Sequence, residues 1–337
     1  PLNQGENTMR AITYSAFGPA AEALSLTEVE TPTAKAGEVL VRLHLSGVNP
    51  SDVKARAGGR PGVPKPPFPQ IIPHSDGAGV IEAVGAGVPP SRVGERVWIW
   101  NGQWQRPFGT CAEYIALPAA QAMPLGDHSF ETGASLGIPA LTAAHCVFGG
   151  GSVEGKTLLV SGGGGSVGFM AVQLAKWAGA RVIATASAGP STDQAQAAGA
   201  DLVLDHRSPT LADDILQATS GNLIYRAIEC EFGANIDTLA TVMAPCGTIA
   251  AYGSAVNMAP TLPFGPLLFK AITIDIALIY ILPAPERAVA IDHIHRALAE
   301  GALTARVHKI YELEDTAKAH EAVEAAHRYG AILVKTA

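Results

Sequence analysis

Cysteine is scarce in this chain of 337 residues, which holds only four: Cys111, Cys146, Cys230 and Cys246. They are scattered and form no Cys-x-x-Cys pair. Neither a disulfide framework nor a structural zinc site is therefore expected. This usage of cysteine fits a reducing compartment, and we predict a cytoplasmic protein.

Long apolar runs and basic runs are also missing. The longest apolar run, 271–282, contains Asp275 and is too short to span a bilayer, and no signal peptide is visible. Charged residues make up 16% of the chain and the net charge is −7. We therefore expect neither a membrane span nor nucleic acid as a main partner. Residues 1–8 are polar, and we expect a disordered arm or a cloning remnant.

Glycine, in contrast, is abundant, with 36 residues, and it is concentrated behind one apolar run. Residues 158–168 read Leu-Leu-Val-Ser-Gly-Gly-Gly-Gly-Ser-Val-Gly, and a helical segment follows. The motif G-x-G-x-x-G falls on Gly163, Gly165 and Gly168. Glycine at these points permits a sharp turn, close approach of the backbone to a pyrophosphate, and tight helix–strand packing. Glycine-rich turns also occur without a ligand, but the strand-to-helix context favours a dinucleotide-binding loop.

The pattern of apolar residues changes near residue 130. From Met9 to about residue 120, short β-type runs alternate with Gly and Pro, which predicts a largely antiparallel β domain. From about residue 132, helices alternate with apolar strands, which predicts a doubly wound parallel sheet of the Rossmann type. The tail from 285 carries two helices and a last strand, 331–335, and we expect it to return to the β domain. The fold class is therefore α/β.

The residues after the second strand of this sheet decide between the two nicotinamide cofactors. An acidic side chain there would bind the 2′-hydroxyl of NAD and repel a 2′-phosphate. The stretch 185–192 contains no Asp or Glu, and His206 and Arg207 follow the third strand. NADPH is favoured, although these two residues can also belong to an ordinary solvated loop, and NADH remains open.

The arrangement of β domain, Rossmann domain and returning tail resembles the medium-chain dehydrogenase/reductase superfamily. Within it, the chain is similar to the zinc-independent quinone oxidoreductase branch, which includes zeta-crystallin. The matching segments are 47–54 (Gly-Val-Asn-Pro-Ser-Asp-Val-Lys), 74–79 (His-Ser-Asp-Gly-Ala-Gly), 94–97, 109–114, 139–143, the glycine cluster, 319–322 and 330–333. The resemblance implies a GroES-like catalytic domain, 9–136 with 278–337, and a Rossmann NADP-binding domain, 137–277.

The same resemblance assigns residues to the cofactor. Contacts to the nicotinamide side and the glycine loop are implied for Asn49, Pro50, Asp52, Thr142, His145, Ser166 and Val167. The 2′-phosphate is assigned to Ser187, Ser191 and His206, although Ser191 stands where relatives carry lysine and His206 where they carry tyrosine. Further contacts are implied for Phe232, Tyr252, Gly253 and Ser254. Relatives also pair across a two-fold axis through an edge strand, so we expect a homodimer through strand 271–282, with a buried intrachain strand as the alternative.

No metal is expected at the catalytic centre. Zinc members of the superfamily hold the metal with three side chains, and the matching positions carry Asn49, His74 and Ile138. A catalytic zinc needs three protein ligands. A single histidine does not hold the metal, and we interpret His74 as a hydrogen-bonded loop residue.

Without a Lewis acid, a good hydride acceptor such as a quinone needs the least assistance from the protein. Asn49 is a candidate hydrogen-bond donor to the acceptor oxygen, or simply a turn residue before Pro50. Lys54 is a candidate proton donor or a site of attraction for anionic substrates, or else an exposed structural lysine. Trp104 is the candidate aromatic wall for a flat acceptor.

Three functions are compatible with these residues. The first is an NADPH-dependent quinone oxidoreductase. The second is an NADPH-dependent reductase of the C=C bond of enones or 2-alkenals. The third is a non-catalytic protein, either an NADPH-binding sensor or an RNA-binding protein, which the acidic balance disfavours.

Overall fold

The computed structural model describes residues 8–325 and 328–337 and divides into two compact units. The first unit contains the residues up to Ile138 together with Ala305–Ala337, and the second is Pro139–Thr304. The chain returns to the first unit at Ala305 and not at 278, because α10 (Ala284–Ala299) stays with the second unit. Of the expected N-terminal arm, residues 1–7 lie outside the described residues, whereas Thr8 already begins a strand.

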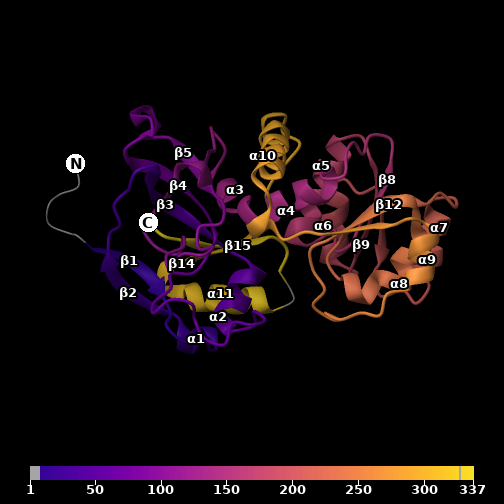
Figure 1. Ribbon diagram of the computed structural model, residues 1–337, viewed down its shortest axis with the longest axis horizontal. Helices are drawn as coiled ribbons and strands as arrows, with labels where there is room; N and C mark the ends of the chain where they lie inside the picture. The colour runs from indigo at the N-terminus through magenta and orange to yellow at the C-terminus, as the bar shows by residue number, and fades with distance from the viewer. Residues whose placement is uncertain (1–7, 326–327) are drawn as a thin grey trace. The chain divides into compact units, whose positions relative to one another are not determined.

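The first unit is built on a seven-stranded, mostly antiparallel sheet. Its strand order is β14-β15-β3-β4-β5-β7, and β6 pairs with β3. These strands are β3 (Glu38–Val48), β4 (Asp76–Val84), β5 (Arg96–Ile99), β6 (Tyr114–Pro118), β7 (Ala122–Pro124), β14 (Val307–Glu312) and β15 (Ala331–Lys335). Strand β15 pairs antiparallel with β3, so the expected return of the tail to the β domain is confirmed (Figure 1).

Shorter elements complete the first unit. Strands β1 (Thr8–Thr13) and β2 (Ser25–Glu30) form a separate antiparallel pair. The helices are α1 (Ala20–Ala23), α2 (Pro50–Ala57), α3 (Phe130–Ala134) and α11 (Thr316–Glu324). Val39, Val41 and Leu43 alternate along β3, so they share one face of the sheet, where they are buried in one apolar cluster.

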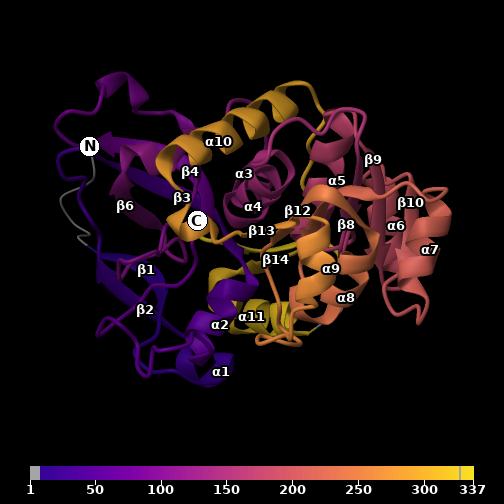
Figure 2. The ribbon, with the colours of Figure 1, turned by 45° about the vertical axis from the view of Figure 1, so that its right-hand side comes forward.

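The second unit is a parallel sheet with helices on both faces. Its order is β10-β9-β8-β11-β12-β13, and every neighbouring pair is parallel. The strands are β8 (Thr157–Val160), β9 (Arg181–Ala186), β10 (Leu202–Asp205), β11 (Ile224–Glu229), β12 (Met243–Ala251) and β13 (Thr273–Ile276). Figure 2 shows β8, β9 and β10 in succession towards α7 (Leu211–Ala218). The remaining helices are α4 (Gly137–Phe148), α5 (Ser166–Trp177), α6 (Pro190–Ala197), α8 (Phe232–Val242) and α9 (Phe264–Phe269).

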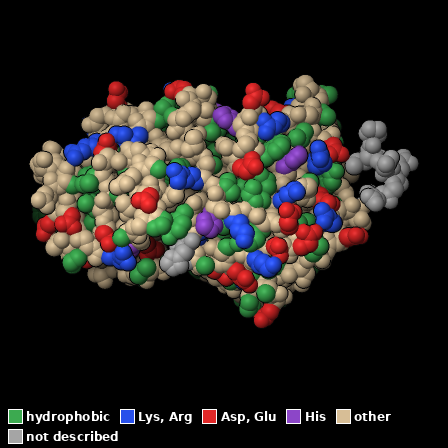
Figure 3. All heavy atoms as spheres, turned by 180° about the vertical axis from the view of Figure 1, so that it is seen from behind, with side chains coloured by type: hydrophobic (Ala, Val, Ile, Leu, Met, Phe, Trp, Pro, Cys, Tyr) green, Lys and Arg blue, Asp and Glu red, His purple; other side chains and the backbone are tan. Residues whose placement is uncertain are grey.

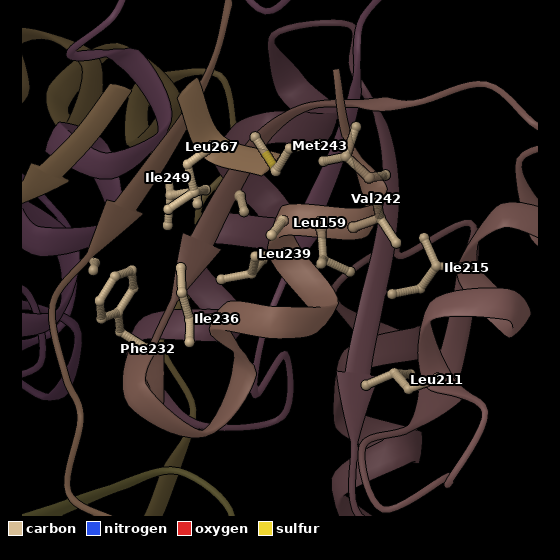
Figure 4. Close-up of a cluster of buried hydrophobic side chains, with 14 of the residues drawn as sticks. Leu159, Leu211, Ile215, Phe232, Ile236, Leu239, Val242, Met243, Ile249 and Leu267 are labelled. Carbon is tan, nitrogen blue, oxygen red and sulfur yellow. The ribbon is translucent and has the colours of Figure 1, made fainter. Parts of the chain in front are cut away.

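One apolar cluster joins α7, α8 and α9 to a face of this sheet. Leu159 and Ile249 of the strands meet Leu211, Ile236 and Leu267 of the three helices (Figure 4). The sheet's winding reverses between β8 and β11, which are neighbours at its centre. In open α/β sheets, ligands bind outside the carboxyl ends of the strands at such a point. The Rossmann-type prediction for this half of the chain is confirmed.

The predicted edge strand 271–282 is much shorter in the structure. β13 is the last strand of its sheet but contains only Thr273–Ile276. Its partner β12 ends at Ala251, which pairs with Ile276, so no ladder continues beyond that residue. The chain then forms a 3₁₀ turn at Ile279–Ile281, whose Ile279 is buried.

Two surface properties bear on possible partners. On the face drawn in Figure 3, acidic and basic side chains are interspersed. Within residues 8–325 and 328–337, none of the helices combines the length and hydrophobicity that crossing a membrane requires.

Candidate active site

The glycine loop joins β8 to α5 and leaves the start of the helix accessible. Gly162 has φ +67°, so the sharp turn falls on this residue and not on Gly163. A Cβ on Gly168 would collide with the carbonyl oxygen of Gly162, which explains the glycine at that point of α5. Gly165 is the N-cap of α5 and is exposed, and a Cβ there would meet only the Gly162 oxygen, at 3.3 Å. The loop therefore presents open backbone at a helix N-terminus and fits a dinucleotide phosphate.

The neighbouring strand β9 holds this loop. The Gly163 N–H donates to the carbonyl oxygen of Thr185 at 2.9 Å. A Cβ on Gly163 would lie 2.7 Å from that of Ala184, so the side chains of β9 also pack tightly against the loop. Ser166 and Val167, the first two residues of α5, are half-buried beside it.

The three residues predicted for a 2′-phosphate are grouped at the end of β9. The hydroxyl of Ser187 lies 3.0 Å from Nε2 of His206, which follows β10. Ser191, in the first turn of α6, lies so close to the loop that a Cβ on Gly164 would collide with its backbone oxygen. The carboxylate of Asp205, the residue before His206, accepts hydrogen bonds from the backbone and side chain of Arg207. The group is therefore polar and includes no acidic side chain of its own.

At the carboxyl ends of β8 and β11, a buried carboxylate links the two central strands. Glu229 accepts hydrogen bonds from the hydroxyl of Ser161 at 2.6 Å and from the side chain of Asn235 at 3.0 Å. Burial raises the pKa of Glu229. Sequence reasoning missed this residue, although both Ser161 and Glu229 follow apolar strand residues, which is the signal that marks this edge of a sheet.

The predicted residues 232 and 252–254 lie next to this carboxylate. The Phe232 N–H donates to the carbonyl oxygen of Gly253 at 3.0 Å, and the Ser254 hydroxyl accepts from the Gly233 N–H at 2.8 Å. Burial raises the pKa of the Tyr252 phenol well above its ordinary value. These residues thus surround the end of β11 and form one group.

Thr142 and His145, the two residues predicted for the nicotinamide side, both lie on α4. Thr142 is buried in α4, whereas His145 contacts Asp275 of β13, with 3.3 Å between Nε2 and Oδ2. A Cβ on Gly149 would lie 3.2 Å from the imidazole, so the ring points towards the C-terminal end of α4. The structure therefore pairs His145 with Asp275, and sequence reasoning gave no role to this carboxylate.

In the first unit, Asn49 caps helix α2 and joins two buried carboxylates. Its backbone N–H donates to Asp52 at 2.8 Å, and its side-chain amide donates to Asp76 at 2.7 Å. Burial raises the pKa of Asp52 to about 7 and that of Asp76 well above its ordinary value. Asn49 is therefore the N-cap of α2, and one N–H of its amide donates to Asp76. Pro50 and Lys54 are exposed on the same helix.

His74 is buried and hydrogen-bonded through both ring nitrogens. Nδ1 lies 2.8 Å from the hydroxyl of Ser46, and Nε2 lies 2.8 Å from Nε2 of His320 on α11. The Thr110 hydroxyl donates to the Asp76 carbonyl oxygen and lies 2.8 Å from the Ser46 hydroxyl. Because the Thr110 hydroxyl already donates its only hydrogen, it must accept a hydrogen bond from Ser46. Ser46 then accepts from His74 Nδ1–H, and His74 Nε2 accepts from His320 Nε2–H.

No ring nitrogen of His74 is therefore left to bind a metal. Burial lowers the pKa of His74 well below its ordinary value and that of His320 to about 3, so both rings are neutral. In the part of the chain that the structure describes, no group of three or more His, Cys, Asp or Glu residues is suited to a metal ion. The side chain of Asn49 is bonded to Asp76, and Ile138 donates only its backbone N–H to the same carboxylate.

Trp104 is half-buried in the loop after β5, with the guanidinium of Arg60 over its ring at 5.7 Å from the centroid. Trp98, an alternative aromatic residue in this region, is fully buried on β5 and belongs to the core. Of the two, only Trp104 retains surface for a ligand.

The comparisons with known proteins agree with this description. The model of the alcohol dehydrogenase GroES-like domain matches residues 35–127, and that of the zinc-binding dehydrogenase family matches residues 166–295. A quinone oxidoreductase of Rattus norvegicus is 30% identical over 252 residues, which are 74% of each chain. The fold is also that of a Pseudomonas syringae quinone oxidoreductase, with a TM-score of 0.84, 28% identity, and 97% and 99% of the two chains covered. A mycobacterial protein solved in complex with NADPH has a TM-score of 0.83 and 26% identity, with 97% and 99% covered.

The chain is therefore a member of the medium-chain dehydrogenase/reductase superfamily. Within that superfamily it belongs to the quinone oxidoreductase branch. The predicted family and the predicted GroES-like and Rossmann folds are confirmed, and the protein is an oxidoreductase of this family.

Proposed function

We propose that the protein is an NADPH-dependent oxidoreductase that transfers hydride to a quinone-type acceptor without zinc. The observation that carries this proposal is the cofactor cradle of the second unit. It combines the open glycine loop with the contact between Ser187 and His206 at the end of β9. The mycobacterial relative that was solved with NADPH has the same fold and supports the choice of cofactor.

The preference for the phosphorylated cofactor is an electrostatic argument. Ser187, Ser191 and His206 offer hydroxyl and imidazole donors, and a 2′-phosphate accepts such hydrogen bonds. An acidic residue would repel it, and Asp205 is instead engaged by Arg207. We propose that these three residues bind the 2′-phosphate.

In the proposed reaction the cofactor supplies the hydride, and the protein positions the reactants. When bound, the nicotinamide supplies a hydride; the quinone takes that hydride and one proton to become a hydroquinone, and the dinucleotide is left oxidised. The protein aligns and desolvates the reactants. We assign to Asn49 a hydrogen bond to the acceptor oxygen, from the amide N–H that Asp76 does not use. Exposed Lys54 can deliver the proton.

We also propose a homodimer through the edge of the second unit. β13 has a neighbour on only one side in its sheet. Near it, Ile276 is 69% exposed and Phe269 90% exposed, which is unusual for large apolar side chains. A second copy would cover both the strand edge and these side chains.

We still predict that the protein is located in the cytoplasm, and all four of its cysteines are free thiols.

The test is a titration of the purified protein with NADPH and with NADH, followed by cofactor fluorescence, and then the addition of 1,4-benzoquinone. The proposal expects tighter binding of NADPH and its rapid oxidation by the quinone. His206→Ala should weaken NADPH more than NADH, and Arg306→Ala, in the other unit, serves as the control for a lost basic side chain.

Each alternative has its own outcome. Turnover of an enone but not of a quinone, with a saturated C–C bond in the product by mass, would identify the C=C reductase. Tighter binding of NADH would refute the phosphate site. Binding of NADPH without turnover on either acceptor would point to a sensor, and binding of RNA at physiological salt would revive the third function.

A further inference from the structure

A cavity of about 590 Å³ lies within the second unit, apart from the cofactor cradle. Its walls include Trp177, the last residue of α5, and residues 151–153, which precede β8. The glycine loop, in contrast, follows β8 and leads into the first residue of α5. The cavity is therefore at the other end of this helix from the loop. Its volume is in the range of pockets that bind small molecules.

Three aromatic side chains line this cavity and contact one another. The ring centroids of Phe148 and His293 are 3.9 Å apart, and Trp177 lies edge-on to Phe148 at 6.3 Å. Burial and the positive charge of Arg296 lower the pKa of His293, so its ring is neutral at pH 7. Its buried Nδ1 has no hydrogen-bond partner in the part of the chain that the structure describes. These three side chains offer an uncharged aromatic surface to a flat ring.

Two opposite charges line the same cavity, one turn of α10 apart. The guanidinium of Arg296 lies over the ring of Trp177, 5.3 Å from its centroid. Oε2 of Glu300 accepts the indole N–H of Trp177 at 2.7 Å. Among the described residues, the two charged side chains form no ion pair with each other. The cavity therefore presents a cation and an anion side by side next to its aromatic surface.

Both charged groups retain unused hydrogen-bonding capacity. Within residues 8–325 and 328–337, the guanidinium of Arg296 has one ionic contact, to Asp292 at 3.8 Å, which is too long for a hydrogen bond. Oε1 of Glu300 has no hydrogen-bond partner in the same residues. Both side chains are exposed, so a ligand would displace only water from them.

We propose that this cavity binds a small aromatic zwitterion, of the class of the free aromatic amino acids. The carboxylate of the ligand lies on Arg296, its ammonium group on Glu300, and its ring against Phe148 and His293. A guanidinium presents a planar fork of donors that matches a carboxylate. A ligand with a single charge would leave one of the two side chains unmatched. The inference goes beyond the proposed function and does not depend on it.

The experiment compares three ligands by calorimetry without cofactor. They are L-tryptophan, indole-3-propanoate, which lacks the ammonium group, and tryptamine, which lacks the carboxylate. We expect L-tryptophan to bind about fivefold more tightly than either analogue, which is the upper range for an exposed ion pair. L-leucine, a zwitterion without a ring, should bind about threefold more weakly than L-tryptophan.

Two substitutions test the two charges separately. With Arg296→Met, L-tryptophan and tryptamine should bind equally, while the preference over indole-3-propanoate should remain. Glu300→Gln keeps an acceptor for the indole N–H of Trp177 and should remove only the preference over indole-3-propanoate. Lys309→Met is the matched control, because Lys309 is exposed in the other unit and lies 4.5 Å from the ring centroid of Tyr311. It should leave both preferences unchanged.

The outcomes that overturn the inference are distinct. They are the absence of binding, or equal affinities of the unaltered protein for L-tryptophan and its two analogues. Preferences that persist in both charge variants would place the ligand elsewhere and would also refute it. Equal binding of L-leucine would overturn the choice of an aromatic ligand. Thermal unfolding checks that each variant folds. Because neither NADPH nor a quinone takes part, failure here leaves the proposed function intact.

Discussion

At the scale of single residues, Asp52 and His320 are buried titratable groups whose pKa values are shifted in opposite directions. Asp52 keeps its proton up to about pH 7 in the folded protein, whereas His320 stays neutral down to about pH 3. In an unfolded chain these groups titrate near 4 and 6.5. Where the two titrations overlap, Asp52 makes the protein less stable as the pH rises and His320 makes it more stable. The two contributions are therefore measured separately, by substituting one residue at a time.

For Asp52, the folded state binds the extra proton between about pH 4 and 7. Its contribution to stability is therefore full below pH 4 and is lost as the pH rises to 7. Asp52→Asn still accepts the hydrogen bond of the Asn49 N–H. We expect its stability relative to the unaltered protein to rise with pH over that range, by at most about 1.4 kcal/mol per pH unit. Urea unfolding at a series of pH values checks this, and a constant difference would contradict it.

For His320, the unfolded state takes up the proton. Stability is full above about pH 6.5 and is lost as the pH falls towards 3, and His74 adds to the same effect. The Gln side chain of His320→Gln can still donate to His74 Nε2, so this variant should fold and lose stability less steeply in acid. His320→Leu leaves the His74 acceptor unpaired and should cost about 1–3 kcal/mol at pH 7. Equal costs for the two substitutions would contradict a stabilising hydrogen bond between His74 and residue 320.

At the scale of elements, the two later glycines of the loop motif have separate tasks. In Gly168→Ala the new Cβ meets the Gly162 carbonyl oxygen, and we expect a loss of about 1–3 kcal/mol in stability. Gly165→Ala has room, so stability should fall by less than about 1 kcal/mol, the cost of a poorer N-cap. Its affinity for NADPH should nevertheless drop, because a methyl group then stands where the phosphate approaches. Thermal unfolding and fluorescence titration measure the two effects.

The elements also show how far the sequence alone reaches. Strands and helices of the parallel sheet follow from their periodicity, and the glycine loop follows from its motif. Helix α2 was missed because its eight residues begin with a proline after Asn49, a pattern that also suits a turn. β13 was predicted too long because propensity does not reveal where its partner β12 ends. The contacts between His74 and His320, or between Asn49 and Asp76, join residues that no local pattern relates.

At the scale of the whole molecule, the dimer proposal predicts a change of mass. Ile276→Lys places a charge on an edge-strand side chain that is already 69% exposed. The fold of one subunit should remain, while the dimer should dissociate because the charge would be buried in the interface. Sedimentation at several concentrations measures this. Leu26→Lys, at an exposed position on β2, is the control and should not change the mass.

The division of the chain into two units also has a consequence for its synthesis on the ribosome. The second unit is continuous, so it can fold as soon as Thr304 has emerged. Synthesis of the first unit begins earlier, but its sheet cannot be completed until the end of the chain has emerged, because β15 lies between β14 and β3. Until Ala331–Lys335 emerges, Leu45–Val48 of β3 lack the strand that pairs with them in the folded protein. Chaperones should therefore be needed for the half that is translated first.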